Sequence, residues 1–151
     1  MTNLAQLYDL IKETFLLLDF GDRQFLEQFD LTVPRYYALV HIATEPGLSP
    51  SRLSRFMFCD KSNVTRLVQS LEREGLVERR PDGFDGRVQQ LYLTAAGTAH
   101  YTTVAAAHNC YVTQRLAALD AAQVEGIRDG LGRLNQALAA SIPMDKAAAL
   151  N

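Results

Sequence analysis

The chain has 151 residues, a length that suits one compact domain or a small domain joined to an oligomerisation arm. Hydrophobic residues make up 48% and charged residues 21%, so there is enough apolar material for a core, and the composition excludes an intrinsically disordered protein. No run approaches the ~18 apolar residues of a membrane span, and the N-terminus carries acids early, unlike a signal peptide. We therefore expect a cytoplasmic protein without membrane contact.

Charge is unevenly distributed along the chain, although its formal net charge is only −2. Residues 49–93 carry eight basic and six acidic side chains, whereas the remainder carries seven basic and eleven acidic ones. The middle is therefore basic and the two ends are acidic. Because nucleic-acid binding depends on where positive charge is concentrated, this distribution is compatible with a DNA-binding segment in the middle.

Six helices and one hairpin are predicted. In the first helix, over about residues 4–20, apolar side chains recur at three- and four-residue steps, and Gly21-Asp22 is expected to end it. Thr32 and Ser49 are each suited to cap a helix, and each is followed by a proline in the first turn. These signals predict a second helix and a short third one.

Asp60 is expected to cap a fourth helix, from residue 61 to about residue 74. Gly75 follows in the position that favours a left-handed backbone. After Gly75 the apolar residues no longer recur at helical spacing but alternate with polar ones. This alternation predicts strands at residues 76–80 and 91–94. The turn between them is rich in Asp and Gly, so its tip should be exposed.

A long fifth helix is expected from Ala95 to about Leu116. Asp120 and Gln123 have the spacing of a capping box, which predicts the start of the last helix. Pro143 should end that helix, and residues 144–151 are expected to be frayed.

Two short helices joined by a tight link and followed by a hairpin form the pattern of a winged helix-turn-helix. The outward positions of the fourth helix carry hydrogen-bonding groups that suit the major groove, where Asn pairs with adenine and Arg with guanine. An ordinary solvated helix face is the competing interpretation. The outward residues are Lys61, Ser62, Asn63, Thr65, Arg66 and Gln69.

The hairpin carries a second DNA-binding signal. Arg87 lies at its tip, two residues after Asp85, whose carboxylate can orient the guanidinium. An arginine on an extended tip can enter a narrow minor groove, where the negative potential is enhanced. Arg79 and Arg80 on the first strand offer phosphate contacts. The competing interpretation is a surface salt bridge on a loop.

The stretch from Leu31 to Gly97 resembles the MarR family (multiple antibiotic resistance regulators). The matching pieces are LTVPRYYALVHI, LSPSRLSRFM, DKSNVTRLVQSLEREGLVERRPD, and D-x-R followed by LTxxG. The resemblance implies a mainly α fold with a small β-hairpin wing. It also implies a winged helix-turn-helix at residues 31–95, and a dimerisation region at residues 1–30 and 96–151.

The resemblance further implies a homodimer that binds palindromic, double-stranded promoter DNA. It implies a repressor that occludes the promoter and is released by a small ligand. The DNA-binding residues we predict are Arg52, Lys61, Ser62, Asn63, Thr65, Arg66, Arg79, Arg80, Asp85 and Arg87. An aromatic or anionic ligand is expected to contact Phe15, Arg35, Tyr36, Tyr37, His41, Met57 and Tyr111.

Three alternatives remain open at this point. Regulation can depend on oxidation of Cys59, which lies near the start of the fourth helix. The protein can also be a DNA-binding regulator that no ligand controls. A winged helix can also serve as a protein-interaction module. We find no nucleophile–base or carboxylate pair for an enzyme and no His/Cys cluster for a metal, so no catalytic residue, metal or cofactor is predicted.

Overall fold

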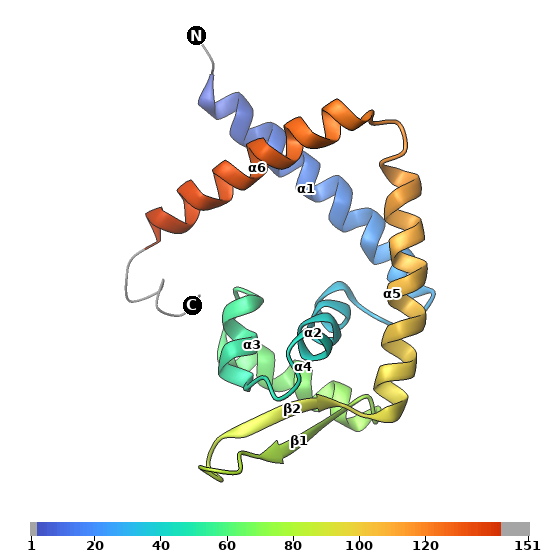
Figure 1. Ribbon diagram of the computed structural model, residues 1–151, viewed down its shortest axis with the longest axis vertical. Coiled ribbons are helices and arrows are strands. Elements are labelled where there is room, and N and C mark those ends of the chain that lie inside the picture. Colours follow the sequence, from blue (N-terminus) through green and yellow to red (C-terminus); the bar gives the residue numbers. More distant parts are fainter. Residues whose placement is uncertain (1–2, 143–151) are drawn as a thin grey trace.

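The computed structural model describes residues 3–142, which form six helices and one antiparallel hairpin (Figure 1). The predicted fold class, mainly α with a small hairpin, is confirmed. The predicted end of the last helix at Pro143 and the frayed tail lie outside the described residues. The elements are α1 (Leu4–Glu27), α2 (Val33–Thr44), α3 (Pro50–Phe56), α4 (Lys61–Arg73), β1 (Val77–Pro81), β2 (Gln89–Leu93), α5 (Ala95–Arg115) and α6 (Ala121–Ser141).

Helix α1 is longer than predicted, because Gly21 does not end it: the helix continues to Glu27. A Cβ atom at position 21 would overlap the Tyr111 hydroxyl and the Arg115 guanidinium of α5. Arg115 also donates a hydrogen bond of 2.8 Å to the carbonyl oxygen of Leu17. Glycine costs a helix up to about 1 kcal/mol relative to alanine, and here it permits the close approach of two helices.

The predicted helix starts are confirmed. The hydroxyls of Thr32 and Ser49 each accept a hydrogen bond from the backbone N–H three residues later, at 3.4 and 3.2 Å. Asp120 and Gln123 form the reciprocal bonds of a capping box, at 2.8 and 2.9 Å. Asp60 occupies the N-cap position of α4, but its side chain makes no capping hydrogen bond. Its carboxylate therefore stays at the surface.

The hairpin pairs β1 with β2, with Val77 opposite Leu93. Leu91 also pairs with Leu48 in an isolated bridge that the sequence did not predict. The Gly47 N–H donates to the Leu91 carbonyl at 2.9 Å, and the Leu91 N–H donates to the Leu48 carbonyl at 2.8 Å. This bridge ties the hairpin to the link between α2 and α3, so the wing has a fixed position relative to the helices.

The hydrophobic core lies almost entirely in the segment from α2 to β2. Helix α1 contributes Leu26 to it, α5 contributes Val104, and α6 has no buried residue. In Figure 1, α6 and the N-terminal half of α1 lie at the end of the molecule away from the hairpin. The core residues are Leu26, Leu31, Tyr36, Ala38, Leu39, Ile42, Leu48, Leu53, Val64, Val68, Leu71, Val77, Leu91 and Val104.

The outer helices expose large apolar side chains instead of burying them. Within residues 3–142, no helix is long and apolar enough to cross a membrane. The exposed side chains form amphipathic faces that one copy of the chain leaves uncovered. They comprise Leu4, Leu7, Tyr8, Leu10, Phe15, Leu16, Leu17, Leu18 and Phe20 on α1, and Val124, Ile127, Leu131 and Leu138 on α6.

Gly97→Ala should destabilise the fold, because a Cβ atom at this buried position in the first turn of α5 would overlap the backbone carbonyl of Leu76. Overpacking against backbone costs about 1–3 kcal/mol. Urea unfolding should show that loss of unfolding free energy. The matched control is Gly126→Ala, whose Cβ atom would meet nothing within 4 Å and which should stabilise α6 by up to about 1 kcal/mol. Equal effects at the two positions would contradict the packing described here.

Candidate DNA interface and adjoining cavity

Helix α4 has one buried apolar side and one exposed polar side. Val64, Val68 and Leu71 are fully buried and hold the helix against the core. Lys61 and Arg66, on the exposed side, form no ion pair with any residue in the range 3–142. Their charges are therefore available to a partner. All six predicted outward residues are exposed: Lys61, Ser62, Asn63, Thr65, Arg66 and Gln69.

The tip of the hairpin presents Arg87, whose side chain is 93% exposed. The Asp85 carboxylate accepts hydrogen bonds from the backbone N–H and the Nε of Arg87, each at 3.1 Å. These bonds lower the pKa of the Asp85 carboxyl below its ordinary value. The pair was expected from the sequence, and its geometry orients the guanidinium without covering it.

The two arginines of β1 are engaged by carboxylates. The Nε of Arg79 lies 3.1 Å from both carboxylate oxygens of Glu72 on α4, and both side chains are partly buried. Arg80 pairs with Glu78 and lies over the Tyr92 ring at 4.4 Å. The Arg79–Glu72 pair fixes the wing strand against α4, whereas the contacts of Arg80 stay within the hairpin. Together these contacts leave less free charge at Arg79 and Arg80 than the sequence suggested.

Two further arginines bind carboxylates on the α2 side of the winged part. Arg52 of α3 forms an ion pair with Glu45, with 2.8 Å between Nε and Oε1. Arg35 of α2 pairs with Glu74, the C-cap residue of α4, and donates to the Asp30 carbonyl at 3.1 Å. Arg35 therefore links the start of α2 to the end of α4.

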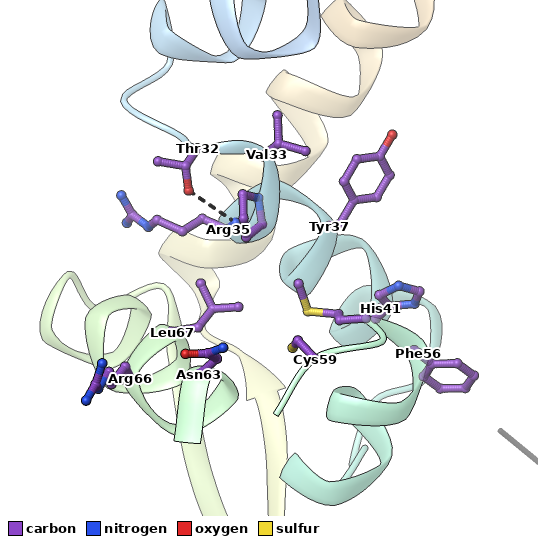
Figure 2. A pocket seen from close by; sticks show the side chains of 12 residues that line it. Thr32, Val33, Arg35, Tyr37, His41, Phe56, Cys59, Asn63, Arg66 and Leu67 are labelled. Carbon is purple, nitrogen blue, oxygen red and sulfur yellow. Dashed lines mark hydrogen bonds between the residues drawn. The ribbon is translucent and has the colours of Figure 1, made fainter. Parts of the chain in front are cut away.

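A cavity of about 730 Å³ lies between the first turn of α2 and the exposed side of α4 (Figure 2). No acidic side chain is found among its lining residues in the described part of the chain. Asn63 and Arg66 line it, although the sequence marked them only as DNA contacts. The lining residues are Thr32, Val33, Pro34, Arg35, Tyr37, His41, Phe56, Met57, Cys59, Asn63, Arg66 and Leu67.

The structure brings together four of the seven residues predicted to contact a ligand: Arg35, Tyr37, His41 and Met57 all line this cavity. The other three lie elsewhere. Phe15 lines a second cavity of about 430 Å³, which Tyr37 also lines. Tyr36 belongs to the core, and burial raises its pKa to about 12. Tyr111 stacks on Phe25 with 4.4 Å between ring centroids.

Burial shifts two titratable groups at the cavity wall. It lowers the pKa of His41, whose ring stacks on Phe56 at 5.1 Å, and so favours the neutral imidazole. Burial, and then the Asp60 carboxylate, raise the pKa of the Cys59 thiol. The position near the start of α4 was expected to favour a thiolate, but these two effects oppose it. Oxidation of Cys59 therefore has little support from its surroundings.

Helices α3 and α4 with the following hairpin define a winged helix-turn-helix protein. Comparison with known proteins agrees with this class. Residues 29–88 match the family model described as MarR family. A similar curated protein is the HTH-type transcriptional regulator SarZ of Staphylococcus saprophyticus, 36% identical over 73 residues, which are 48% of this chain and 50% of SarZ. The chain spans about half the length of the curated relatives that it matches.

Two solved structures share the fold over most of the chain. FabT of Streptococcus pneumoniae in complex with DNA has a TM-score of 0.78 and 22% identity, and covers 90% of this chain and 97% of that one. A mutant MarR of E. coli complexed with operator DNA has a TM-score of 0.79 and 23% identity, and covers 87% of this chain and 94% of that one. At these identities the likeness establishes the fold alone.

Arg87→Gln should return the pKa of the Asp85 carboxyl toward its ordinary value of 3.8, because hydrogen bonds from Arg87 are the main cause of its depression. Because folding lowers the pKa of the Asp85 carboxyl, the Asp85–Arg87 contact is fully formed above pH 3.8. It is lost as the pH falls through the pKa that this carboxyl has in the folded protein. An NMR titration of the Asp85 carboxyl carbon measures the change. Lys61→Gln, which removes a distant charge, should leave the titration unaltered. The same midpoint in wild type and Arg87→Gln would refute the pairing.

Proposed function

We propose that the chain is a homodimeric transcriptional regulator that binds palindromic double-stranded DNA and represses by occluding a promoter. One observation carries the proposal: the exposed polar side of α4 and the Arg87 tip belong to one rigid winged part. A helix with such a face suits the major groove, and an arginine on an extended tip suits the minor groove beside it.

Each predicted contact has a role in this proposal. Asn63 and Arg66 read bases, with the geometry that suits adenine and guanine, respectively. Ser62 and Thr65 reach bases or phosphates from the same side of α4. Lys61 and the arginines engaged by carboxylates position the protein through phosphates. These arginines are Arg52, Arg79 and Arg80.

The uncovered apolar faces support the dimer. Burying apolar surface contributes about 25 cal/mol per Å², so the exposed side chains of α1 and α6 favour association. We assign residues 1–30 and 96–151 to the dimerisation region and residues 31–95 to DNA binding. A two-fold pair would set its α4 helices one DNA turn apart, about 34 Å. FabT and the MarR mutant were solved in complex with DNA and with operator DNA, which supports DNA binding by proteins of this fold.

Release from DNA follows, in this proposal, from a small aromatic or anionic ligand in the 730 Å³ cavity. The aromatic and sulfur side chains of its wall suit a planar ring, and the absence of acids among the lining residues suits an anion. Asn63 and Arg66 would contact both ligand and DNA. Occupancy of the cavity and of the major groove would then be mutually exclusive.

Arg87→Ala should weaken binding to duplex DNA. It should also reduce the slope of log affinity against log salt concentration by about one, because the variant lacks one cation that neutralises DNA phosphate charge. The measurement is a mobility-shift titration, at several salt concentrations, on the DNA upstream of the protein's own gene. Arg128→Ala removes from α6 another exposed cation that is paired with a carboxylate, and is the matched control, expected to bind like wild type. If Arg87→Ala kept the wild-type slope, the wing would not contact DNA.

A phenolic acid that occupies the cavity should raise the melting temperature in a concentration-dependent way, because it binds the folded state alone. A thermal-shift screen of phenolic acids without DNA tests this expectation. Arg66→Gln should abolish the shift, since it removes the unpaired cation of the cavity wall, whereas Lys61→Gln should retain it. Shifts that persist in Arg66→Gln would place the ligand elsewhere, and a complete lack of shifts would remove the ligand from the proposal.

A further inference from the structure

Phe84 is the most exposed large apolar side chain in the part of the chain that the structure describes, at 105% of its reference area. It lies at the tip of the hairpin, in a stretch of Asp and Gly residues that gives its ring no apolar neighbour. Burying a phenylalanine side chain is strongly favourable, whereas a fully exposed one adds nothing to the stability of the fold. The ring is therefore available to a partner.

The backbone that carries Phe84 is held in place by Asp82. One carboxylate oxygen of Asp82 accepts hydrogen bonds from the N–H groups of Phe84 and Asp85, at 2.8 and 3.1 Å. The other accepts one from the side-chain amide of Gln90, at 2.8 Å. The Asp82 N–H donates to the Val88 carbonyl at 2.8 Å. Because the tip is ordered before binding, less conformational entropy is lost when it meets a partner.

Phe84 shares this tip with Arg87, which is 93% exposed. The tip therefore combines one apolar ring with one cation, three residues apart. The carboxylates of Asp82 and Asp85 are both occupied by hydrogen bonds within the tip. The minor groove matches this combination, because phosphates line its edges while sugars and base edges form its walls and floor. Minor-groove proteins often insert a phenylalanine or leucine wedge at a base step.

We propose that Phe84 is a further DNA-contacting residue of the wing, which enters the minor groove beside Arg87 and packs its ring against a base step. The inference rests on the duplex-binding function proposed above. A wedge partly unstacks the step that it meets, and pyrimidine–purine steps unstack most readily. Phe84 therefore gives the protein a preference for a flexible step at the wing, in addition to the bases that α4 reads.

The chain contains no tryptophan, so Phe84→Trp places a single fluorescent probe at the tip. The duplex is one that the wild-type protein selects from a random library, and anisotropy of labelled DNA monitors binding. Tryptophan emission should shift to shorter wavelength and lose intensity in parallel with the anisotropy. Thr113→Trp puts the same probe on an exposed polar position near the end of α5, which lies away from the hairpin in Figure 1, and its emission should not change.

Affinity gives a second readout. Phe84→Ala should bind the selected duplex about tenfold more weakly, the fold-change expected for part of a phenylalanine's burial. Its salt slope should equal that of wild type, because an apolar contact releases no counterion. Phe84→Leu, which keeps an apolar wedge, should recover much of the loss. The melting temperature should stay unchanged in each variant, because the ring is fully exposed in the part of the chain that the structure describes.

Normal duplex binding by Phe84→Trp without any change in emission would overturn this inference and leave the proposed function intact. The same holds if Phe84→Ala binds as tightly as wild type. If the wild-type protein binds no duplex at all, the proposed function fails, and the role of Phe84 fails with it.

Discussion

The apolar surface of α1 and α6 is the physical constraint on which the rest of this structure depends. The winged part holds most of the core, from Leu31 to Leu91, and the helices outside it add only Leu26 of α1 and Val104 of α5. Helix α6 buries nothing, and α1 buries a single leucine. Because exposed leucine and phenylalanine faces favour association, the outer helices make physical sense as a dimer arm that sets the distance between two winged parts.

Carboxylate pairing explains how an acidic chain can display a basic surface. Arg35, Arg52, Arg79 and Arg80 each lie against a glutamate, so their charges mainly hold the winged part together. Lys61 and Arg66 have no such partner within residues 3–142, and the partner of Arg87 leaves its guanidinium exposed. These three exposed cations lie on the exposed side of α4 and at the wing tip, the two places that would meet the grooves of a duplex.

Local signals in the sequence predicted most of the fold, because caps and turns depend on a few adjacent residues. Thr32, Ser49 and Asp120 start their helices as expected, and Gly75 has the left-handed backbone, with φ of 72°. The prediction that Gly21 ends the first helix was wrong. A glycine is needed there because Tyr111, ninety residues away in sequence, approaches the helix closely. The predicted outward face of α4 was right because helical periodicity determines it. Only four of the seven residues predicted to contact a ligand line one cavity. Periodicity does not reveal that Tyr36 faces the core or that α2 and α4 enclose a cavity.

The most direct test of this account is the mass of the full chain in solution, measured by light scattering after size-exclusion chromatography without DNA. The account predicts a stable particle with twice the chain's mass of 16.8 kDa, since the arms bury their apolar faces on each other. A monomer that remains soluble at micromolar concentration would contradict it, because the exposed faces of α1 and α6 would then need another explanation.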